Sequence, residues 1–134
     1  MTQQPLHYRT ASVLAAEIAA GDLDSTQVTE ALLARIERLQ PKLKAYVTLM
    51  GDVAMDRAAA ADAVRGRGCD LGPLHGVPIA VKDVYHKRGF PTTGRHSFLR
   101  DTTSETDATV VSRLEAAGAV IVWQRGARLF HLVC

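Results

Sequence analysis

Two apolar runs of strand length, separated by a helix-length segment, constrain the fold of this chain more than any other feature. Residues 77–81 and 119–123 contain no charged residue and do not alternate with polar positions. Such runs are typical of strands that are buried on both faces of a parallel sheet. Between them, Asp107 is expected to open a helix over residues 108–117, which Gly118 ends. This strand–helix–strand order predicts an α/β fold with a parallel sheet.

The segment before the first run is predicted to be helical. Thr10 is placed to cap a helix over residues 10–20, and Gly21 stands where a left-handed C-terminal cap belongs. The alanine-rich residues 52–65 predict another helix, whose small side chains permit close packing against a neighbour. Residues 45–50 are rich in β-formers and are expected to be extended.

A further helix is predicted between these two. Either Asp24 or Ser25 can cap it, and we interpret Ser25 as a cap rather than a nucleophile. The helix is expected to run to about Gln40, because Pro41 should stop it. Glu30 and Glu37 fall on its exposed side.

Composition and charge exclude several classes of protein. The 134 residues are 47% hydrophobic, suit one domain, and contain no apolar run of the ~18 residues that a membrane span needs. A net charge of +2 does not predict a nucleic-acid partner. The polar residues 1–9 do not resemble a secretory signal. Cys69 and Cys134 lack CxxC spacing, which predicts neither a disulfide framework nor a zinc site, and we expect a cytoplasmic location.

Basic residues and histidines gather in one region, between residues 75 and 100. The spacing of the histidines matches no common set of metal ligands, so no metal is predicted. We interpret the region as a solvated loop. Its members are Lys82, Lys87, Arg88, Arg95 and Arg100, together with His75, His86 and His96.

Lys82 is the candidate catalytic residue. It closes the first apolar run, and ligands of open α/β sheets bind beyond the carboxyl ends of the strands. A lysine that is partly desolvated there can act as a general base. The alternative is a structural lysine that pairs with a carboxylate such as Asp83.

Three ordered motifs extend this interpretation. Residues 72–83, the Gly-x-Pro-Thr-Thr segment at residues 89–93 and residues 107–121 resemble the hallmarks of the amidase signature family at family-like spacing. The resemblance covers residues 10–122. It implies the helices and first strands of a mixed, mostly parallel sheet, with no cofactor. It also implies hydrolysis of a small-molecule carboxamide by a Ser–cis-Ser–Lys triad, in which Lys82 is the base and the substrate-binding residues are unknown.

The serines of the chain do not match the family's triad positions. None of them follows the lysine in a glycine-rich stretch; they are Ser12, Ser25, Ser97, Ser104 and Ser112. The resemblance also stops abruptly near Trp123, which suggests a changed reading frame. We therefore expect an inactive N-terminal fragment of a single amidase domain. The alternatives are a non-catalytic subunit or interaction module, which pairs with a partner subunit or with itself, and an inert remnant.

The domain is expected to comprise a helical N-terminal segment at residues 1–70, the start of the α/β core at 71–123 and a divergent tail at 124–134. Strands of the buried type that lack neighbours expose apolar edges. The sequence therefore predicts poor solubility or loose packing for the isolated chain. His75, Thr92 and Thr93 are expected to be structural, and Asp83 is expected either to orient Lys82 or to bind backbone.

Overall fold

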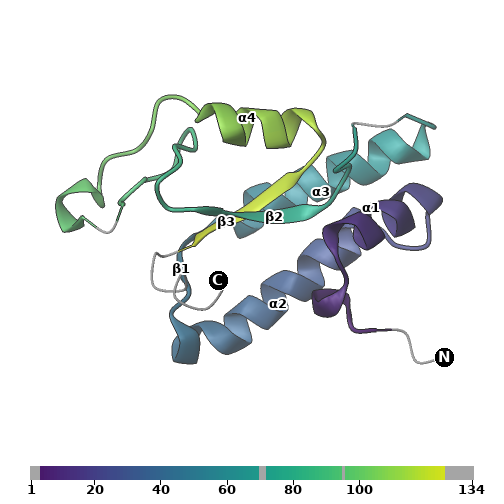
Figure 1. Cartoon of the computed structure of the whole chain (residues 1–134), viewed down its shortest axis with the longest axis horizontal. Coiled ribbons are helices and arrows are strands. Elements are labelled where there is room, and N and C mark those ends of the chain that lie inside the picture. Colours follow the sequence, from purple (N-terminus) through teal and green to yellow (C-terminus); the bar gives the residue numbers. More distant parts are fainter. Residues whose placement is uncertain (1–3, 70–71, 95, 126–134) are drawn as a thin grey trace.

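The computed structural model describes residues 4–69, 72–94 and 96–125, which form a small sheet with helices on both faces (Figure 1). The helices α1, α2 and α3 lie on one side of the sheet and α4 lies on the other. The elements in chain order are η1 (Leu6–Tyr8), α1 (Ala11–Ala20), α2 (Ser25–Leu43), β1 (Tyr46–Leu49), α3 (Gly51–Gly66), β2 (Pro78–Lys82), η2 (Ser97–Leu99), α4 (Thr109–Ala116) and β3 (Val120–Arg125).

The three strands form a mixed sheet in the order β1-β3-β2. β2 and β3 are parallel and are connected through α4, as the strand–helix–strand pattern predicts. β1 corresponds to the segment at residues 45–50 that we expected to be extended, and it pairs antiparallel with β3. The predicted α/β class with a mixed sheet is therefore confirmed.

Side chains of the central strand β3 alternate between two cores. Val120 and Val122 pack against α2 and α3, in a cluster with the buried alanines Ala54 and Ala58. Ile121 points to the opposite face and packs with the α4 residue Val111. This alternation follows from the two-residue period of a strand. The alanine-rich helix therefore packs closely against the sheet, as its composition predicts.

β2 is less covered than its sequence suggests. Val81 is buried, but Pro78, Ile79 and Ala80 are only half-buried. Within the described residues, β3 lies along one edge of β2 and no strand pairs with the other. A strand whose sequence is typical of burial on both faces is thus exposed along one edge.

The caps of α1 are those predicted, whereas the end of α2 is not. The Thr10 side chain accepts a hydrogen bond from the Val13 N–H, and Gly21 is left-handed with φ 82°. Pro41, however, lies inside α2, which continues to Leu43. Its ring lacks the N–H for one helical hydrogen bond. The last turn is nevertheless closed, because Lys44 N–H donates to the Gln40 carbonyl at 2.8 Å.

α4 begins later than expected. Ala108, not Asp107, is its N-cap, because the Asp107 carboxylate turns toward Lys87 and the Arg88 N–H instead. Gly118, with φ 89°, follows the end of the helix as predicted. Within the described ranges, no helix is both long enough and apolar enough to cross a membrane.

Candidate functional site

Lys82 is the last residue of β2 and is half-buried. The chain turns immediately after it, because the N–H groups of Val84 and Tyr85 both donate to the Lys82 carbonyl, at 2.8 and 3.1 Å. Its Cα is paired in register with that of Arg125, so the parallel strands β2 and β3 reach the same edge of the sheet. Lys82 therefore stands where open α/β sheets bind their ligands.

Asp83 holds the loop that follows. The residue is 2% exposed, and its carboxylate accepts hydrogen bonds from the backbone N–H of Thr93, at 2.9 Å, and from the Thr93 hydroxyl. The Asp83 carbonyl also accepts from the N–H of Gly94 at 3.0 Å. Of the two roles expected for Asp83, backbone binding is thus the one seen in these contacts. Thr93 is buried and shapes the loop, as predicted.

A second polar cluster ties the loop to α4. The Lys87 ammonium lies 3.2 Å from Asp107 Oδ1 and 3.1 Å from Glu115 Oε1, and the residue is only 8% exposed. The expectation of a uniformly solvated basic loop is therefore wrong for Lys87, because two carboxylates compensate its burial. Partial burial would raise the pKa of Asp107. The hydrogen bond from the Arg88 N–H and the Lys87 ammonium outweigh that effect, so its pKa lies below the ordinary value.

A contact between the Ser104 hydroxyl and the His86 imidazole joins the two ends of the irregular segment between β2 and α4. Ser104 Oγ lies 2.7 Å from His86 Nδ1 and 3.1 Å from Thr92 Oγ1. Two isolated β-bridges lie next to this contact: Arg88 pairs with Ser104, and Pro91 pairs with Thr103. Sequence reasoning missed this pair, since neither residue lies within a recognisable spacing motif.

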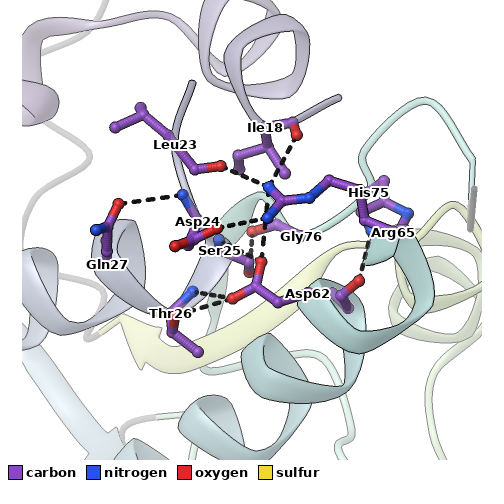
Figure 2. A network of polar contacts seen from close by, with 11 residues as sticks. Ile18, Leu23, Asp24, Ser25, Thr26, Gln27, Asp62, Arg65, His75 and Gly76 are labelled. Carbon is purple, nitrogen blue, oxygen red and sulfur yellow. Dashed lines mark hydrogen bonds and ion pairs between the residues drawn. The ribbon is translucent and has the colours of Figure 1, made fainter. Parts of the chain in front are cut away.

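The opposite end of β2 is held by the turn at residues 73–76, which precedes the strand, and by α2 (Figure 2). The Ser25 hydroxyl is buried and donates to the Gly76 carbonyl at 2.6 Å. The interpretation of Ser25 as a helix cap is wrong, because Asp24 is the N-cap and Ser25 is the first helical residue. His75 is buried and its Nε2 lies 2.9 Å from the Ala61 carbonyl, in keeping with the structural role expected for it.

Two side chains of α3 join the ends of the first two helices (Figure 2). The Asp62 carboxylate accepts hydrogen bonds from the N–H groups of Ser25, at 2.7 Å, and Thr26, at 3.0 Å, at the start of α2. The Arg65 guanidinium donates to the carbonyls of Ile18, at 3.0 Å, and Leu23, at 2.7 Å, around the end of α1. Each charge is favourable at its helix end, negative at an N-terminus and positive near a C-terminus.

The histidines of the region do not converge. His75 lies against α3 and His86 against Ser104, whereas the His96 ring is close to that of Phe98. Among the described residues, no group of three or more His, Cys, Asp and Glu side chains could hold a metal ion. Arg95 and the tail from residue 126 lie outside the described residues.

The chain is similar in sequence to amidases and to amidotransferase subunits. It is 45% identical over 117 residues to a glutamyl-tRNA(Gln) amidotransferase subunit of Chloroflexus aurantiacus, a match that covers 87% of this chain and 24% of that protein. It is 50% identical over 105 residues to the putative amidase AmiD of Mycobacterium tuberculosis, a match that covers 78% of this chain and 22% of that protein. The chain thus spans about a quarter of the length of these relatives.

Solved structures agree with this likeness. The peptide amidase of Stenotrophomonas maltophilia superposes with a TM-score of 0.84 at 36% identity, covering 90% of this chain and 25% of that one. A fatty acid amide hydrolase superposes with a TM-score of 0.83 at 27% identity, covering 90% and 21%. The sequence model of the Amidase family matches residues 27–125, a span that includes β2 and Lys82. The chain therefore belongs to the amidase signature family.

Proposed function

We propose that this chain supplies the lysine of an amidase that hydrolyses carbon–nitrogen bonds of small carboxamides. The observation that carries the proposal is the position of Lys82, at the carboxyl end of β2 within the segment that matches the family. In its neutral form the amine would take a proton from a bridging serine, which takes one from the serine nucleophile. The nucleophile attacks the carbonyl carbon of the amide, and the proton held by the lysine passes back to the leaving nitrogen, so that ammonia or an amine departs. Water then hydrolyses the acyl-enzyme and regenerates the serine.

The serines whose side-chain contacts are described support other roles. The Ser25 hydroxyl binds Gly76, which precedes β2, whereas Lys82 ends that strand roughly 20 Å further along the extended chain. Ser104 is engaged with His86, and Ser112 is part of α4. The chain of 134 residues is accordingly proposed to be inactive by itself and to need serines from elsewhere.

An amide-hydrolysis assay tests the proposed inactivity, and any turnover that it detects also tests the role of Lys82. Purified chain is incubated with simple carboxamides, and ammonia release is measured beside Lys82→Ala. We expect no turnover above the buffer rate for either protein. Turnover that Lys82→Ala abolishes would show that the chain is an active enzyme and would refute the proposed inactivity. Turnover that survives the substitution would refute the role of Lys82.

A non-catalytic subunit is the second candidate. It is favoured by the similarity to a protein that is named as part of an amidotransferase. In this role the helices would bind a partner, and Lys82 would take no part in catalysis. Co-purification distinguishes the two candidates, because a non-catalytic subunit is expected to elute with a stoichiometric partner, and the complex is expected to show no amidase activity that depends on Lys82.

A further inference from the structure

An open groove lies on the side of the molecule formed by α2, β1 and the start of α3. It has a volume of about 740 Å³, within the range of ligand-binding clefts. Its floor and walls are mainly apolar. The apolar lining residues are Leu33, Ala34, Ile36, Pro41, Tyr46, Val47, Leu49 and Met55.

Part of this apolar lining is open to solvent. Val47 and Leu49 of β1 are each 49% exposed, whereas Ile36 is buried in the core with Ala54 and Val122. The exposed apolar residues therefore lie next to a packed core. Contiguous apolar side chains in such a position are typical of surfaces that bind another molecule.

The charges at the rim have one sign. Glu30, Glu37 and Asp52 line the groove and are exposed, and none of the described residues that line it is basic. Within the described residues, none of these carboxylates is engaged in an ion pair. A chain with a net charge of +2 thus has a locally acidic groove. Two copies docked groove to groove would oppose these carboxylates, which disfavours a symmetric dimer through this surface.

The groove suits a helix better than an added strand. Gln40 already occupies the backbone at the start of β1, because its amide binds the Tyr46 carbonyl at 2.6 Å and the Tyr46 N–H at 3.2 Å. An added strand could not use those groups. Glu30 and Glu37 are seven residues apart on α2, so their Cα atoms are separated by about 10 Å, or two helical turns. Basic residues at the same spacing on an adjacent helix would face them.

We propose that this groove binds a basic amphipathic helix of a partner protein. The apolar face of that helix lies on Leu33, Val47 and Leu49, and its lysine or arginine side chains meet Glu30 and Glu37. This mode of recognition places apolar anchors at positions i, i+3, i+4 and i+7 in a groove. The proposal does not depend on amide hydrolysis, since the lining residues all belong to α2, β1 and α3.

A labelled model peptide tests the proposal on the intact chain at micromolar concentration. The peptide has leucines at i, i+3, i+4 and i+7 with lysines at the flanks, and its control carries glutamates in place of the lysines. Binding is followed by fluorescence anisotropy. We expect the basic peptide to bind, the acidic one not to bind, and the affinity to fall as salt is raised.

Charge reversal locates the binding surface. The double variant Glu30→Lys/Glu37→Lys is expected to weaken binding about tenfold or more. The matched control Glu105→Lys changes an exposed glutamate in the loop before α4 and should leave the affinity within about twofold. Leu49→Asn, at an exposed position, should weaken binding without loss of far-UV circular dichroism.

Several results would overturn the proposal. They are equal binding of both peptides, equal effects of Glu105→Lys and of the double variant, or binding to a chain without a native spectrum. Sedimentation velocity tests whether a second copy of the chain, rather than a partner helix, occupies the groove. A dimer that Leu49→Asn dissociates would show that a second copy fills the groove instead.

Discussion

At the scale of single residues, Gly76 fixes how the chain enters β2. It has φ 71°, and a Cβ built on it would lie 2.8 Å from the Cβ of the buried Ser25. Both the left-handed backbone and the lack of space favour glycine. The same residue positions the strand, because the Gly76 N–H donates to the Gly118 carbonyl at 2.9 Å.

Replacing Gly76 by alanine should therefore destabilise the fold by more than the cost of placing alanine at a positive φ. Gly68 is the matched control, since it has φ 76° and nothing within 4 Å of a built Cβ. We expect Gly68→Ala to cost about 1 kcal/mol and Gly76→Ala a further ~1–3 kcal/mol. Urea denaturation at low protein concentration measures the difference. Equal losses would show that the contact with Ser25 relaxes freely.

At the scale of elements, α3 stabilises the ends of α1 and α2 through Asp62 and Arg65. Asp62→Ala should leave the N–H groups of Ser25 and Thr26 without their acceptor and destabilise the fold by about 1–2 kcal/mol. Asp56→Ala, at an exposed position of the same helix, carries the same gain in helix propensity without a cap to lose. Asp62→Ala should therefore lower the urea midpoint, whereas Asp56→Ala should leave it unchanged or raise it slightly. Similar midpoints would contradict the capping role.

The contact between the loop and α4 should depend on pH. The pKa of Asp107 is below its ordinary value in the fold, so its contribution to stability is present above the unfolded pKa of about 3.9. That contribution is lost as the pH falls through the lower folded value. Between pH 5 and pH 3, the range in which the loss begins, Asp107→Asn should therefore lose less stability than the wild type.

The denaturation midpoints at the two pH values measure this effect. Asp101→Asn is the control, because Asp101 is exposed in the same loop. An unchanged pH dependence in Asp107→Asn, or the same change in Asp101→Asn, would show that the ion pairs around Lys87 are not responsible.

Local patterns predicted these elements better than the contacts between them. Thr10 and Gly21 bound α1 because caps depend on neighbouring residues only. Ser25, Lys87 and Asp107 were misjudged because their partners lie far along the chain, at Gly76, Glu115 and Arg88. The position of Lys82 at a strand end was predictable from the apolar run before it. The Ser104–His86 contact was not predictable, since no rule of sequence spacing indicates which residues of an irregular loop contact each other.

At the scale of the whole molecule, the sheet is open along β2. This strand is half-buried within the described residues, and the chain spans 24% of the Chloroflexus aurantiacus relative that it matches. An apolar strand with an unpaired edge is a template for association. The groove beside β1 lies along the opposite edge of the sheet, so a partner there would leave β2 open.

The isolated chain is therefore expected to have low solubility and to associate through β2. Co-expression with the part of the Mycobacterium tuberculosis relative AmiD that follows its match to this chain should raise the soluble yield, because this part would cover the β2 edge. Co-expression with an unrelated soluble protein is the control. Soluble yield and sedimentation velocity are the measurements. A chain that remains a soluble monomer without this co-expressed part would show that the described strands and helices suffice for a closed fold.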